Sequence, residues 1–154
     1  MMPLNTPLFL PDAAATANLA RALAPHLRAG DTVLLEGQIG AGKTHFARAL
    51  IQHFVAEDVP SPSFTLVQTY DAPAFEIWHA DLYRLAHPDE AVELGLTEAF
   101  ESALCLVEWP ERLGADRPEK ALTLRFSVLD HGRSVTALAD DPAWKARLKE
   151  VPDV

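Results

Sequence analysis

The pattern of hydrophobic and polar positions divides the chain into buried strands and amphipathic helices. Residues 32–37 (TVLLEG) and 103–109 (ALCLVEW) are short and almost wholly apolar, which is typical of strands buried on both faces of a sheet. Residues 11–27 repeat leucine at i, i+4 and i+8, which predicts a helix with one buried stripe. The pattern therefore predicts an α/β fold whose core strands run parallel.

The C-terminal part of the chain carries a different pattern. Residues 121–130 and 133–139 alternate apolar and polar side chains around an Asp-His-Gly turn, as an antiparallel hairpin with a solvated face does. We expect this hairpin to extend the sheet, which gives a mixed α/β sheet with parallel core strands, flanking helices and a C-terminal antiparallel hairpin. The other predicted elements are an edge strand at 6–10, a helix at 43–54, strands at 65–70 and 75–82, short helices at 87–96 and 97–102, and a closing helix at 141–151.

Composition and charge limit where the protein is expected to act and which kinds of molecule it is expected to bind. The chain has 154 residues, of which 49% are hydrophobic, so we expect a single domain over residues 1–154. It contains no apolar run long enough to cross a membrane. The lone Cys105 cannot form an intramolecular disulfide, which fits a reducing, cytoplasmic location. The formal net charge of −9 disfavours a nucleic-acid-binding surface, because phosphate binding relies on clustered Lys and Arg. Proteins or small molecules are the expected partners.

A phosphate-binding loop is the clearest motif. The segment GQIGAGKT matches G-x-x-x-x-G-K-[ST] and lies between a predicted buried strand and a predicted amphipathic helix. Gly37, Gly40 and Gly42 let the backbone turn its N–H groups inward, and the helix N-terminus favours anions. Lys43 would reach the β- and γ-phosphates, and Thr44 would offer its hydroxyl to Mg²⁺. An ordinary glycine turn with a solvated lysine is the weaker reading, because strand, loop and helix agree.

Two acidic residues close predicted strands. Glu108 ends ALCLVE and Asp81 ends FEIWHAD. Ligands of α/β sheets bind outside the carboxyl ends of the strands, and Mg²⁺ in phosphate-loop proteins usually needs an acid there. Glu108 is favoured for the metal over a role as a solvated charge, because it closes a wholly apolar strand. From the residues alone, Asp81 could equally cap the turn that follows it.

Further polar groups flank these strands. Ser61, Ser63 and Thr65 lie in a proline-broken loop, which in many nucleotide switches senses the γ-phosphate, although the residues alone favour a plain connection. His79 and Asp81 lie at i, i+2 on one strand face, a spacing that suggests a metal pair. Trp109 follows the strand-end acid. It either forms a wall of the cleft or, more commonly for tryptophan, belongs to the core or a partner surface.

The order of these motifs resembles the TsaE (YjeE) family, small bacterial P-loop ATPases of the pathway that places threonylcarbamoyl on adenosine 37 of tRNA. The matching segments are GQIGAGKTHF, SPSFTLVQTY, HADLYRL, ELGLTEAF and LCLVEWPER, with LPDAAAT and GRSV towards the two ends. They cover nearly the whole chain, and DLYRL with EWPER is more specific than the phosphate loop. Gln38, His45 and Ser63 stand where the family usually has Asp, Thr and a second Thr.

The resemblance implies roles for particular residues. It makes Thr44 and Glu108 the Mg²⁺ ligands, and it makes Asp81 a catalytic or switch acid beside Lys43 and Glu108. It makes the Ser61–Thr65 loop a γ-phosphate sensor. The residues that it implies bind the nucleotide are Asp12, Gly37, Gly40, Ala41, Gly42, Lys43, Thr44, His45, Ser61, Ser63, Thr65, Trp109 and Arg133.

The resemblance also implies an activity and partners. It implies hydrolysis of ATP with Mg²⁺, weak without partners, that resets the TsaD–TsaB complex between turnovers. Because those partners would hold the tRNA, the isolated acidic chain is not expected to bind it. Two alternatives remain open. A small-molecule kinase would use the same loop and have its own acceptor pocket, and a nucleotide-gated binding module would bind ATP without hydrolysing it.

Overall fold

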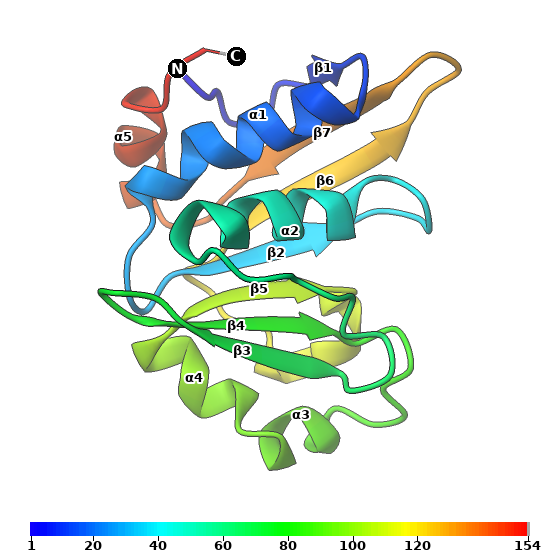
Figure 1. Ribbon diagram of the computed structural model, residues 1–154, viewed down its shortest axis with the longest axis vertical. Helices are drawn as coiled ribbons and strands as arrows, with labels where there is room; N and C mark the ends of the chain where they lie inside the picture. Colours follow the sequence, from blue (N-terminus) through cyan, green and yellow to red (C-terminus); the bar gives the residue numbers. More distant parts are fainter. Residues whose placement is uncertain (154) are drawn as a thin grey trace.

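The computed structural model describes residues 1–153, and a seven-stranded sheet forms its centre (Figure 1). The strand order is β1-β7-β6-β2-β5-β4-β3. The inner strands β6, β2, β5 and β4 run parallel, whereas β7 and β3 are antiparallel to their neighbours. The prediction of parallel core strands and a C-terminal antiparallel hairpin is thus confirmed. The strands are β1 (Leu8–Leu10), β2 (Thr32–Glu36), β3 (Val67–Asp71), β4 (Glu76–Asp81), β5 (Leu104–Glu108), β6 (Leu122–Val128) and β7 (Arg133–Leu138).

Helices on both faces explain why the central strands are apolar throughout. Leu34 and Leu35 of β2 point to opposite faces, yet both are buried. Leu35 belongs to the cluster that contains Phe46, and Leu34 belongs to the cluster that contains Leu96. In Figure 1, α1 and α2 lie on one face of the sheet, and α4 packs against β4 and β5. The helices are α1 (Ala13–Leu23), α2 (Lys43–Phe54), α3 (Asp89–Glu93), α4 (Leu96–Ser102) and α5 (Ala143–Lys149).

Several predicted boundaries differ from the observed ones. The helix predicted over residues 11–27 ends at Leu23, and a 3₁₀ turn that contains Pro25 follows. The helix predicted over 87–96 shrinks to α3, because Gly95 adopts a left-handed conformation and separates it from α4. The 3₁₀ segment Pro110–Asp116 was not predicted. Within residues 1–153, no helix has the length and apolar character needed to cross a membrane.

Candidate functional site

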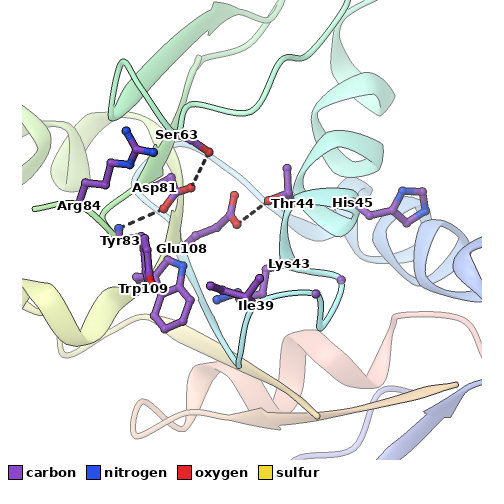
Figure 2. A pocket seen from close by; sticks show the side chains of 12 residues that line it. Ile39, Lys43, Thr44, His45, Ser63, Asp81, Tyr83, Arg84, Glu108 and Trp109 are labelled. Carbon is purple, nitrogen blue, oxygen red and sulfur yellow. Dashed lines mark hydrogen bonds between the residues drawn. The ribbon is translucent and has the colours of Figure 1, made fainter. Parts of the chain in front are cut away.

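A cleft forms where parallel strands end together. The register of β4 and β5 pairs Asp81 with Glu108, so the two acids that close these strands lie side by side. Both are almost fully buried, although each belongs to a charged residue type that rarely lies inside a protein unpaired. The cleft encloses about 460 Å³ and is drawn in Figure 2. Its lining residues are Ile39, Gly40, Gly42, Lys43, Thr44, His45, Ser63, Asp81, Tyr83, Arg84, Glu108 and Trp109.

The phosphate-loop sequence forms a tight backbone turn at one wall of the cleft. Gly37, Gly40 and Gly42 have φ angles of +138°, +82° and +104°, in the region that favours glycine. A Cβ on Gly37 would lie 2.7 Å from the backbone oxygen of Phe126 in β6. Helix α2 starts at Lys43, and within the described chain no side chain caps it. Its first N–H groups therefore remain available to an anion.

Lys43 occupies the loop itself. The residue is 5% exposed, and its Nζ donates a hydrogen bond to the backbone oxygen of Gly37. The same Nζ lies 3.4 Å from the centre of the Trp109 ring, a distance at which a cation and a π system attract each other. Burial lowers the pKa of Lys43, and the charges of Glu108, Glu111 and Asp81 oppose that shift. A bound polyanion would offset the cost of burying this cation.

Glu108 is held from two directions at the floor of the cleft. Thr44 Oγ1, at the start of α2, donates to Glu108 Oε1 over 2.7 Å (Figure 2). His79 Nε2 lies 2.7 Å from Glu108 Oε2. Strands β4 and β5 and helix α2 together supply this chain of contacts. The pairing of His79 with Asp81 that the sequence suggested is replaced by a pairing of His79 with Glu108.

The donor set at this point fits a hard divalent cation. Thr44 and Glu108 present a hydroxyl and a carboxylate oxygen to each other, and Mg²⁺ prefers oxygen ligands. Among residues 1–153, no group of three or more His, Cys, Asp and Glu side chains is arranged to hold a metal. Mg²⁺ in proteins is commonly held by one or two side chains together with substrate phosphates and water. Thr44 and Glu108 therefore suit an ion that arrives with a nucleotide.

Asp81 connects the floor of the cleft to the serine-containing loop. It accepts a hydrogen bond from Ser63 Oγ at 3.3 Å and one from the Tyr83 backbone N–H at 3.1 Å (Figure 2). Ser61 and Ser63 lie 2.7 Å apart through their hydroxyl oxygens. The Tyr83 contact is the turn cap that was one of the two roles considered for Asp81 from the sequence. The Ser63 contact adds a link to the serine-containing loop. Asp81 therefore holds two segments at once.

Comparison with known proteins identifies the family. Residues 10–135 match the family model of the threonylcarbamoyl adenosine biosynthesis protein TsaE. The chain belongs to the TsaE family. Its role therefore lies in tRNA threonylcarbamoyladenosine biosynthesis.

Individual TsaE relatives match over most of the chain. The tRNA threonylcarbamoyladenosine biosynthesis protein TsaE of Rickettsia bellii is 38% identical over 143 residues, which are 92% of this chain and 99% of that protein. The TsaE protein of Haemophilus influenzae is 34% identical over 116 residues, which are 74% and 73% of the two chains. The crystal structure of Bacillus subtilis YdiB has the same fold, with a TM-score of 0.77 at 24% identity over 95% of this chain and 93% of the other.

The cleft of this TsaE-family chain contains most of the residues predicted for the site. Those that line it are Gly40, Gly42, Lys43, Thr44, His45, Ser63, Asp81, Glu108 and Trp109. Predicted residues outside the lining are Asp12, Gly37, Ala41, Ser61, Thr65 and Arg133. Asp12 caps α1 by accepting from the Ala15 N–H, and Thr65 accepts from Gln68 Nε2. Arg133 donates to the backbone oxygen of Gly40 at 3.1 Å, so it supports the phosphate loop from outside.

Three lining residues were absent from the predicted site. Tyr83 and Arg84 follow Asp81 in the segment DLYRL, so their position beside a candidate acid was the available signal. The Tyr83 ring lies 4.9 Å from the Trp109 ring, and the Arg84 guanidinium lies 4.7 Å from the Phe64 ring. Ile39, inside the phosphate loop, is largely exposed. Its apolar side chain gave no chemical reason to select it.

Proposed function

We propose that the chain is a Mg²⁺-dependent ATPase of tRNA threonylcarbamoyladenosine biosynthesis and acts on the TsaD–TsaB complex to reset it between turnovers. The TsaE family gives the pathway. The single observation that most supports nucleotide hydrolysis is the meeting of Lys43, Thr44 and Glu108 in one cleft beside an uncapped helix N-terminus. These are the types of group that phosphate-loop proteins use for phosphates and Mg²⁺.

Phosphate binding in this proposal relies on the phosphate loop. The backbone N–H groups around Gly40 and Gly42 and the start of α2 would face the phosphates. Lys43 would exchange its bond to the Gly37 carbonyl for bonds to the phosphates. Because Lys43 is buried, water would screen its attraction for the phosphates only weakly.

Thr44 and Glu108 would hold Mg²⁺, whose charge would neutralise part of the charge on the bound phosphates. The Thr44 hydroxyl now donates to Glu108, and it would turn its oxygen lone pairs to the ion. Glu108 is 2% exposed, and a buried carboxylate is stabilised by a cation in contact with it. The two residues thus supply the oxygen ligands on the protein side.

Asp81 would act as the catalytic or switch acid. It accepts from Ser63 Oγ, and it could accept a proton or a hydrogen bond from water at the end of the nucleotide. Movement of Ser63 towards a γ-phosphate would break the contact with Asp81. The state of the nucleotide would therefore change the conformation of the Ser61–Thr65 loop.

The partner part of the proposal rests on charge and on the pathway. A chain with a net charge of −9 is poorly suited to hold tRNA itself. TsaD and TsaB would hold the tRNA, and this chain would act in the cytoplasm by binding them. Exposed side chains are available for such contacts: Ile39 and Tyr83 line the cleft, and Phe64 lies beside Arg84, which also lines it.

A phosphate-release assay tests the proposal. We expect slow release from ATP by the chain alone and faster release when TsaD and TsaB are added, with GTP as the comparison nucleotide. Glu108→Gln is the matched variant, because the amide keeps the shape and removes the charge. Tight ATP binding without phosphate release, even with both partners present, would contradict hydrolysis and favour the nucleotide-gated module. Transfer of phosphate to a small acceptor without partners would favour the kinase.

A further inference from the structure

His79 lies behind Glu108 and has no access to solvent. Its side chain is 0% exposed, and that of Glu108 is 3% exposed. The His79 Nε2 atom lies 2.7 Å from Glu108 Oε2, while Thr44 contacts the other carboxylate oxygen. The imidazole therefore cannot reach a ligand in the cleft. Any influence on that ligand must pass through Glu108.

The contacts of His79 define the direction of its hydrogen bond. An ionised carboxylate only accepts hydrogen bonds, so Nε2 carries the hydrogen and donates to Glu108. The other ring nitrogen, Nδ1, is buried and finds no hydrogen-bond partner within residues 1–153. A buried polar atom without a partner is unfavourable. The imidazole is therefore poorly suited to the core, except for its bond to Glu108.

The neighbours of His79 on its strand face also favour an apolar side chain over an imidazole at this position. Ile77 precedes it on the same face of β4, and Leu106 is its partner in β5; both are fully buried and apolar. An apolar side chain at position 79 would match these neighbours and leave no polar atom unpaired. It would also leave Glu108 Oε2 without its donor, free to turn away from Thr44.

We propose that His79 is a positioning residue that fixes the Glu108 carboxylate so that Oε1 faces Thr44 and the Mg²⁺ of a bound nucleotide. The inference rests on the proposed function, because that function makes Glu108 a metal ligand. Groups that hydrogen-bond a metal ligand from behind orient it and affect metal affinity by about 10- to 100-fold. His79 is then needed for the metal-dependent part of nucleotide binding, and the phosphate loop binds the phosphates without it.

Two variants of His79 separate positioning from packing. In His79→Gln, the amide nitrogen can occupy the place of Nε2 and donate to Glu108. In His79→Asn, the amide nitrogen corresponds to Nδ1 and falls short of Glu108. Both variants bury one amide, and asparagine is smaller than glutamine by one methylene. Ile77→Val is the control for a small loss of packing on the same strand face.

The experiment measures the Mg²⁺ concentration that gives half of the ATP-induced melting shift, and ATP affinity in EDTA. We expect His79→Asn to raise that Mg²⁺ concentration about tenfold or more with unchanged affinity in EDTA. His79→Gln and Ile77→Val should stay near wild type. Equal shifts in the Gln and Asn variants, or a wild-type Mg²⁺ response in the Asn variant, would overturn the positioning role alone. A wild-type chain that Mg-ATP does not stabilise would overturn the proposed function and this inference with it.

Discussion

Among single residues of the cleft, Lys43 is the buried cation. It is a buried cation whose pKa burial lowers, while Glu108, Glu111 and Asp81 act in the opposite direction. Its contacts are a backbone oxygen and the face of Trp109. Phosphates would provide the full opposite charge that these contacts lack.

Lys43→Ala should therefore remove most of the stabilisation by nucleotide. A ligand at 100 times its dissociation constant adds about 2.7 kcal/mol to the free energy of unfolding, and we expect Mg-ATP to give the wild type a gain of this size. Melting curves with and without Mg-ATP measure it. Lys145→Ala, which removes an exposed lysine on α5, is the control and should keep the full shift. An equal shift in Lys43→Ala would contradict the role of Lys43.

At the scale of elements, the phosphate loop is shaped by the strand beside it as well as by its own glycines. A Cβ on Gly37 would lie only 2.7 Å from the carbonyl oxygen of Phe126 in β6. β6 pairs with β2 directly before the loop. The C-terminal hairpin, which looks like a simple extension of the sheet, therefore sets the path of the loop.

Gly37→Ala should cost more stability than Gly40→Ala. Gly40 has nothing within 4 Å of the place of its Cβ, so alanine there costs only the left-handed conformation, about 1–2 kcal/mol. Gly37→Ala should destabilise the fold more, because its φ of +138° is less accessible to alanine than the +82° of Gly40 and because the new Cβ must also displace the β6 carbonyl. Urea unfolding of the two variants measures the difference. Equal losses would show that β6 does not restrict the loop.

Some features of the fold and the site could be predicted from the sequence and others could not, for a physical reason. The strands that contain Leu34 and Val107 could be predicted because burial on both faces leaves an apolar run in the sequence. The left-handed conformations of Leu66 and Trp109 could not, because no local signal favours them in these residue types. Position at a strand end identified Glu108 and Asp81. The bond between His79 and Glu108 depends on β4 lying next to β5, a long-range fact that local pattern does not contain.

At the scale of the whole molecule, the sheet encloses its only cysteine. Cys105 lies in the central strand β5 and is fully buried. Burial raises the pKa of its thiol to about 12, and the charge of Glu76 adds to the shift. The folded chain thus keeps a proton that the unfolded chain loses near its ordinary pKa of 9.0. This contribution to stability is complete below pH 9 and is lost as the pH rises towards 12.

Cys105 should therefore report the unfolding of the sheet. At pH 8 we expect a thiol reagent to leave the native protein almost unlabelled, because the reactive thiolate is scarce and inaccessible. Labelling in increasing urea should follow the loss of helical circular dichroism. Fast labelling without urea would mean that β5 opens locally while the rest of the fold remains intact.

The overall charge predicts a division of roles, in which the chain binds protein partners and does not bind tRNA itself. With a net charge of −9, the isolated chain should bind free tRNA negligibly at physiological salt, since basic groups provide non-specific affinity. Its affinity for the TsaD–TsaB complex should change with Mg-ATP, and by linkage the complex should change nucleotide affinity by the same factor. Titrations of tRNA and of the complex, each with and without Mg-ATP, measure both. Submicromolar tRNA binding by the chain alone, or partner affinity indifferent to nucleotide, would contradict this division.

Lys43, Thr44 and Glu108 should together form one site for Mg-ATP. Calorimetric titration of ATP into the wild type and Glu108→Gln, each in Mg²⁺ and in EDTA, tests it most directly. We predict that Mg²⁺ strengthens ATP binding by the wild type and has little effect on Glu108→Gln, while the two proteins bind ATP similarly in EDTA. No ATP binding by the wild type, or an equal effect of Mg²⁺ on both proteins, would contradict the claim.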